Sequence, residues 1–178
     1  MNKDINEKLE TLENQKLKFL KCFELISDEK LNTQPAKDKW SLAQILYHIV
    51  KAEQGTLLSF MNSIRNGNNL NKVGSKAFIK SKFLNLALKS NLKFKAPPVA
   101  QKVPDNVNVK EISNKWDEIR KDIKNACLKI PEENYNKGIF KHPYIGLINL
   151  EQSLNFLINH INHHLQQVEK ISCQLNQN

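Results

Sequence analysis

Residues 150–175 read LEQSLNFLINHINHHLQQVEKISCQL, and this stretch decides the fold class. One helical face is marked by alternating steps of four and three residues: Leu150, Leu154, Leu157, Ile161, His164, Val168, Ile171 and Leu175. This heptad-like spacing is typical of a helix packed along antiparallel neighbours. Asn149 is a plausible N-cap with Gln152 at the N3 position, so we expect the last helix over about 149–175.

Three earlier segments also have helical apolar periodicity. They predict helices over about 4–27, 41–64 and 109–129. Ser41 and Gln44 form a capping box at the start of the second helix. Four long amphipathic helices with a long connection predict an all-α, antiparallel four-helix bundle, with a crossover between the second and third main helices. We expect one domain over residues 1–178.

Three segments between and within these helices carry further expectations. The first helix is expected to use Leu9, Leu12, Leu17, Leu20, Phe23 and Ile26 as its apolar positions. Within the crossover, residues 78–88 are compatible with a short helix, and Pro97 and Pro98 require extended backbone. Residues 131–148 are expected to form a loop.

The net charge of +9 is concentrated in one part of the chain. Residues 54–104 contain no Asp or Glu, while residues 65–102 contain nine Lys and Arg side chains. This basic segment is either a solvated connection or a surface that attracts an anionic substrate, a thiol cofactor or a phosphate. Its few aromatic side chains argue against nucleic-acid binding.

The remaining composition indicates a cytoplasmic protein. The polar first residues lack the apolar core of a secretory signal, and no apolar run reaches the roughly 20 residues of a membrane span. Cys22, Cys127 and Cys173 are far apart in the sequence and form no C-x-x-C pair. Three unclustered cysteines indicate reduced thiols that fill core or surface positions.

Two histidines interrupt the apolar face of the last helix. His164 lies in the middle of that face, and His160 lies about 40° to one side of it. Residues four apart share a face, so the two imidazoles can bind one metal ion. His163 lies about 100° away and is either a group behind the ligands or a surface residue.

Three other residues in the sequence leave alternatives open. His48 lies among small residues of the second helix, where a pocket-edge role and metal ligation are both compatible with the pattern. Glu53 falls within an apolar stripe, so it requires a polar partner, for which Trp40 or a lysine is a candidate. It is either a structural contact or an acid–base group beside the site. His142 either stabilises a turn or reaches over the mouth of the site.

Four motifs together resemble the DinB-like superfamily of metal-binding four-helix bundles. They are WSLAQILYH at 40–48, Glu53, HPYIG at 142–146 and HINHHLQQ at 160–167. Their order and spacing resemble the family from about residue 5 to 172. The resemblance implies that His48, His160 and His164 bind a divalent metal, often zinc or nickel. It also implies frequent dimers and a possible relation to transferases and isomerases that use thiols such as bacillithiol or mycothiol.

The leading functional hypothesis is a metal-dependent enzyme with a small-molecule substrate. The metal would activate a thiol, for a transferase, or a water molecule, for a hydrolase. Glu53, His142 and His163 are the candidates for groups behind the ligands. The alternative is a non-catalytic, dimeric helical bundle with a stress or binding role. The third hypothesis, nucleic-acid binding through residues 65–102, has the least support in the sequence.

Overall fold

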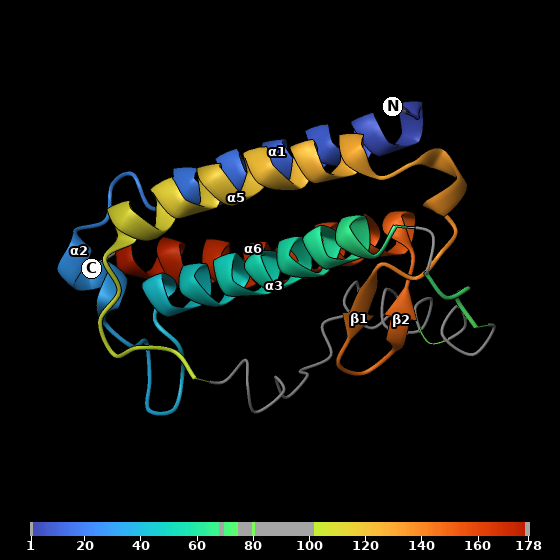
Figure 1. The fold of residues 1–178 in the computed structure, drawn as a ribbon. Coiled ribbons are helices and arrows are strands. Elements are labelled where there is room, and N and C mark those ends of the chain that lie inside the picture. Colours follow the sequence, from blue (N-terminus) through green and yellow to red (C-terminus); the bar gives the residue numbers. More distant parts are fainter. Residues whose placement is uncertain (1, 68–69, 75–79, 81–101, 177–178) are drawn as a thin grey trace.

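The computed structural model describes residues 2–67, 70–74, 80 and 102–176, and four long helices dominate it (Figure 1). These are α1 (Lys3–Lys21), α3 (Leu42–Asn66), α5 (Val109–Lys129) and α6 (Leu150–Asn176). The shorter elements are α2 (Asp28–Asn32), a 3₁₀ turn (Glu132–Asn134), β1 (Phe140–His142) and β2 (Gly146–Ile148). The predicted all-α four-helix bundle is confirmed.

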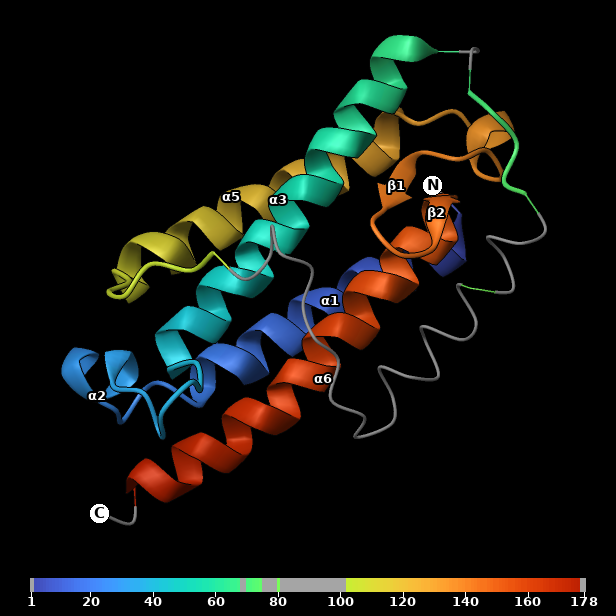
Figure 2. The same cartoon turned by 90° about the horizontal axis from the view of Figure 1, so that it is seen from below.

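The long helices form two parallel pairs that run in opposite directions. Figures 1 and 2 show α1 beside α6 and α3 beside α5, and the two members of each pair run the same way. Helix α3 has 25 residues and is therefore about 38 Å long. The chain must return over this length before α5 begins, which explains the long crossover. Apart from Lys80, which is helical, the expected short helix over 78–88 lies outside the described residues, as do Pro97 and Pro98.

Helix boundaries are set by local capping contacts. The Ser41 hydroxyl accepts a hydrogen bond from the Gln44 backbone at 3.2 Å, and the Gln44 side chain accepts one from the Ser41 backbone at 3.0 Å. Asn149 and Gln152 make the same reciprocal pair at 2.9 and 3.0 Å. Helix α3 stops at Gly67, whose φ of +53° favours glycine. Both predicted capping boxes are confirmed.

The first predicted helix is too long. Helix α1 ends at Lys21, and α2 starts after Ser27, whose hydroxyl accepts a hydrogen bond from the Lys30 backbone. The expected helix over 4–27 therefore ends six residues early, and a separate short helix begins beyond it with its own N-cap. The buried face of α1 includes Leu12 and Phe19, whereas Leu17 is 57% exposed and was wrongly assigned to the core.

The expected loop over 131–148 contains a small hairpin. Strand β1 pairs with β2 antiparallel, with Phe140 opposite Ile148 and His142 opposite Gly146. Gly146 has a φ of +84°, a conformation that glycine adopts without strain. Strands of three residues are too short for an alternating pattern to be recognised in the sequence.

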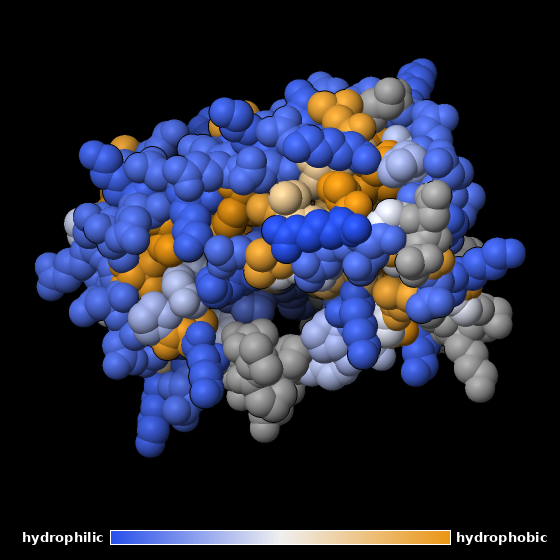
Figure 3. Space-filling view, in the orientation of Figure 1, coloured by the Kyte–Doolittle hydropathy of each residue, from blue (hydrophilic) through white to orange (hydrophobic). Residues whose placement is uncertain are grey.

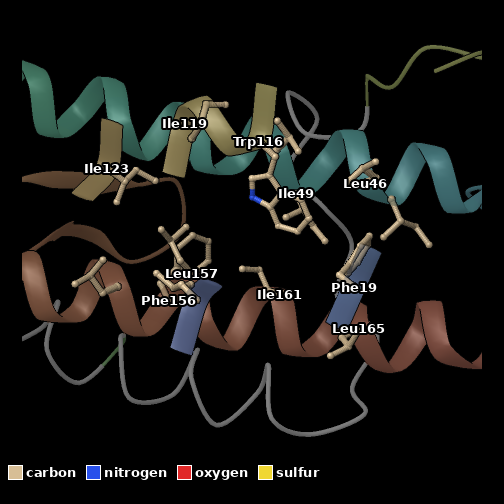
Figure 4. Close-up of a cluster of buried hydrophobic side chains, with 14 of the residues drawn as sticks. Phe19, Leu46, Ile49, Trp116, Ile119, Ile123, Phe156, Leu157, Ile161 and Leu165 are labelled. Carbon is tan, nitrogen blue, oxygen red and sulfur yellow. The ribbon is translucent and has the colours of Figure 1, made fainter. Parts of the chain in front are cut away.

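The core lies between the two helix pairs (Figure 4). Trp116 of α5 is fully buried, and its ring meets Phe19 of α1 edge-on with the centroids 5.6 Å apart. Ile49 of α3 and Ile161 of α6 are fully buried in the same cluster. On the outer face drawn in Figure 3, hydrophilic side chains separate small apolar groups. None of the described helices has the length and apolarity required to cross a membrane.

A buried ion pair joins α3 to α5. Both carboxylate oxygens of Glu53 accept hydrogen bonds from Arg120, at 2.6 and 2.8 Å. Glu53 is fully buried and Arg120 is 7% exposed. The expected polar partner is therefore present, but it is Arg120 instead of Trp40 or a lysine, since periodicity within one helix does not identify the facing helix. Burial raises the pKa of the Glu53 carboxyl, and the positive charge of Arg120 opposes that shift.

Replacing Arg120 with methionine should lower the free energy of unfolding by about 3–5 kcal/mol, because it leaves the Glu53 carboxylate buried without its partner. The double variant Glu53→Met with Arg120→Met should recover most of that loss, since it removes both charges. Urea unfolding at pH 7 measures both changes. A single variant as stable as the parent chain would show that the pair does not constrain α3 and α5.

Candidate metal centre

Three histidine side chains converge inside the bundle from two helices that are far apart in the sequence. His48 comes from α3, and His160 and His164 come from one turn of α6. The Nε2 atoms of His48 and His160 are 3.1 Å apart. One ring nitrogen from each of the three histidines lies within 4.8 Å of the others. The ring centroid of His48 lies 5.0 Å from that of His160 and 5.0 Å from that of His164.

Burial keeps the imidazoles of His160 and His164 neutral. His48, His160 and His164 are each only 7–9% exposed. Burial first, and then the neighbouring His164 and His48, lower the pKa of His160 well below its usual value. Burial, with His48 as the next cause, lowers the pKa of His164 to about 3. Near pH 7 the lone pairs of His160 and His164 are therefore not taken up by protons, which is the state that metal coordination needs.

The distance between two of the donor atoms fits a divalent metal ion. Tetrahedral zinc with imidazole ligands at 2.0–2.1 Å places two ligand nitrogens about 3.3 Å apart. The 3.1 Å separation between His48 and His160 is close to that value. Three neutral nitrogen donors suit zinc and nickel, and they leave further coordination positions for other ligands. The histidine group is therefore capable of holding a metal ion.

Each ring of the group has a neighbour that restricts its orientation. Trp40, in the turn before α3, lies with its ring centroid 4.9 Å from that of His48. Phe156 stacks on His160 at 5.4 Å with an interplanar angle of 18°. The amide oxygen Oε1 of Gln167 lies 3.2 Å from Nδ1 of His164. Phe156 was missed in the sequence, although its position four residues before His160 places it on the same helical face.

His142 has the turn-stabilising role, one of the two that the sequence left open. Its Nδ1 accepts a hydrogen bond from the Tyr144 backbone at 3.2 Å, which stabilises the turn. Its ring also meets Phe156 edge-on at 4.5 Å, and Phe156 stacks on His160. His142 is thus connected to the histidine group through one aromatic ring.

The other two candidates lie outside the group. His163 is half-buried beside His164, with ring centroids 5.3 Å apart. Glu53 uses both carboxylate oxygens for Arg120. Among the described residues, the group that could hold a metal ion contains only His48, His160 and His164. Their ligation of a metal, and any second role for His163 or Glu53, stay predictions.

Fold and site together define a class of protein: a four-helix bundle with a histidine group between facing helices that can hold a metal. The family model of the DinB superfamily matches residues 11–168, and the chain belongs to that superfamily. This confirms the family resemblance drawn from the motifs.

Two similar proteins come from Bacillus subtilis. The uncharacterized protein YuaE of strain 168 is 25% identical over 146 residues, which cover 82% of this chain and 85% of YuaE. The structure of YfiT, described as a probable metal-dependent hydrolase with an unusual four-helix bundle topology, matches with a TM-score of 0.66. That match covers 99% of this chain and 90% of YfiT at 15% identity, so it shows a shared fold.

The buried His142 should make stability depend on pH. Burial lowers the pKa of His142 from 6.5 to about 4, so the unfolded chain binds a proton more readily than the folded one. This contribution to stability is complete above pH 6.5 and is lost as the pH falls toward 4. When the pH falls from 7 to 5, the free energy of unfolding should therefore decrease in both proteins. The decrease should be about 2 kcal/mol smaller in His142→Asn than in the parent chain.

Urea unfolding of the metal-free protein at several pH values measures this difference. Asparagine keeps an acceptor for the Tyr144 backbone, so the comparison isolates the titration of the imidazole. Parallel pH profiles for the two proteins would contradict the burial of a neutral His142.

Proposed function

We propose that this chain is a divalent-metal-dependent enzyme in which His48, His160 and His164 hold the ion. The convergence of three ring nitrogens within 4.8 Å is the observation that carries the proposal. Zinc or nickel is the expected metal, because neutral imidazole ligands suit both. A small molecule is the proposed substrate.

The chain's own residues supply a preorganised and largely dry site. Burial keeps the rings of His160 and His164 neutral, and Trp40 and Phe156 pack against the rings of His48 and His160. A divalent ion held there by the three histidines would supply the Lewis acidity to activate a water molecule or a thiol as the nucleophile. Glu53 is a weak candidate for a general base because its two oxygens already accept hydrogen bonds from Arg120.

Two reactions remain open in this proposal. Hydrolysis is favoured by the similarity in fold to YfiT, itself described as a probable metal-dependent hydrolase. Transfer to or from a low-molecular-weight thiol is the other reaction, suggested by the family resemblance of the motifs. We also propose that the chain forms a homodimer and is located in the cytoplasm. Sedimentation of the purified chain tests whether it is a dimer.

Removing any one of the three histidines should abolish stoichiometric metal binding. Protein without a histidine tag is loaded with zinc or nickel, freed of excess ion and analysed for metal. We expect about one ion per chain in the parent protein and loss of that ion in His48→Ala, His160→Ala and His164→Ala. The matched control is His163→Ala, which removes a neighbouring imidazole outside the group and should retain the ion.

Circular dichroism of each variant confirms that the bundle is still folded. Retention of the ion by all three folded variants would contradict the proposed site. Metal-loaded protein is then assayed with ester, amide and phosphoester substrates, and separately with thiols and electrophiles. Metal-dependent turnover without added thiol identifies a hydrolase, and turnover only with thiol identifies a transferase. A stably bound ion without either activity supports the non-catalytic alternative.

A further inference from the structure

We propose that Gln167 is a positioning residue that fixes the ring of His164 in the tautomer needed for metal binding. This inference rests on the proposed function, because it concerns how one of the three ligands is prepared. Gln167 follows His164 by three residues on α6, so the two side chains lie on neighbouring positions of the same helical face.

The contact between the two side chains has a defined direction. Nδ1 of His164 lies 3.2 Å from the amide oxygen Oε1 of Gln167. An amide oxygen only accepts hydrogen bonds, so the imidazole must donate its proton from Nδ1. The lone pair of the neutral ring is then on Nε2. Partners of this kind orient metal-binding histidines in proteins and raise their basicity.

The ring of His160 does not have this kind of preparation. The Nε2 atoms of His48 and His160 face each other at 3.1 Å, so one must donate and the other accept when no ion lies between them. Within the described part of the chain, Nδ1 of the buried His160 has no hydrogen-bond partner. Its ring is held by stacking on Phe156 instead. In contrast to His160, His164 therefore has its tautomer set by a side-chain acceptor before the ion arrives.

The position of Gln167 allows this role to be separated from a role in folding. Gln167 is half-buried and is not part of the hydrophobic core. A methionine there keeps the length of the side chain and a similar helix propensity, but it removes the strong acceptor. The exposed neighbour Gln166 provides a matched control on the same turn.

The test compares zinc affinity in Gln167→Met, Gln167→Glu and Gln166→Met by competition with a chromophoric chelator. We expect Gln167→Met to bind zinc about 10–100-fold more weakly, which is the usual effect of losing a partner behind a ligand. Gln167→Glu should restore the affinity because its carboxylate accepts the same hydrogen bond. Gln166→Met should match the parent chain, and circular dichroism should show that all three metal-free variants are folded.

Nitrogen-15 NMR of the metal-free protein reads the tautomer of His164 directly. The parent chain and Gln167→Glu should carry the proton on Nδ1, whereas Gln167→Met should show a mixture of tautomers. Unchanged zinc affinity, or an unchanged tautomer, in Gln167→Met would overturn the role of Gln167. A parent chain that binds no ion would instead contradict the proposed function, and the NMR result separates these two failures.

Discussion

The packing of α3 against α6 is the constraint on which the histidine group depends. The two helices are separated by more than 80 residues of sequence, yet they bring His48 to within 3.1 Å of His160. The long crossover makes this possible, because it allows α3 and α5 to run parallel while α6 runs in the opposite direction beside α3. A rotation of either helix about its axis would move one ring away from the others.

The core around this contact balances apolar packing against a few buried polar groups. Three imidazoles and one carboxylate are removed from water within the same bundle. The carboxylate of Glu53 is compensated inside the chain by Arg120. The imidazoles are compensated only in part, since Nδ1 of His160 has no hydrogen-bond partner in the described structure. Buried polar groups without full compensation cost stability, which is why such groups concentrate at functional sites.

The sequence predicted the long elements well and the short ones poorly. The spacing in α6 and the capping boxes at Ser41 and Asn149 are local signals, and they located the helices closely. The hairpin at 140–148 has strands too short to produce a pattern, and the helix start at Ser27 was hidden by continuous apolar spacing. His160 and His164 could be paired from one helix alone. Periodicity could not identify the facing residues His48 and Arg120, because it indicates which face of a helix is buried and not which helix covers that face. His48 was assigned to the group only through the family resemblance.

X-ray absorption spectroscopy of the zinc-loaded, tag-free chain tests the central claim most directly, because it identifies the atoms bound to the ion. Three imidazole nitrogens are expected at about 2.0–2.1 Å from the zinc, together with the oxygen of an exchangeable water molecule. A spectrum with sulfur at about 2.3 Å, or without the outer-shell scattering of imidazole rings, would show that the ion is held elsewhere in the chain.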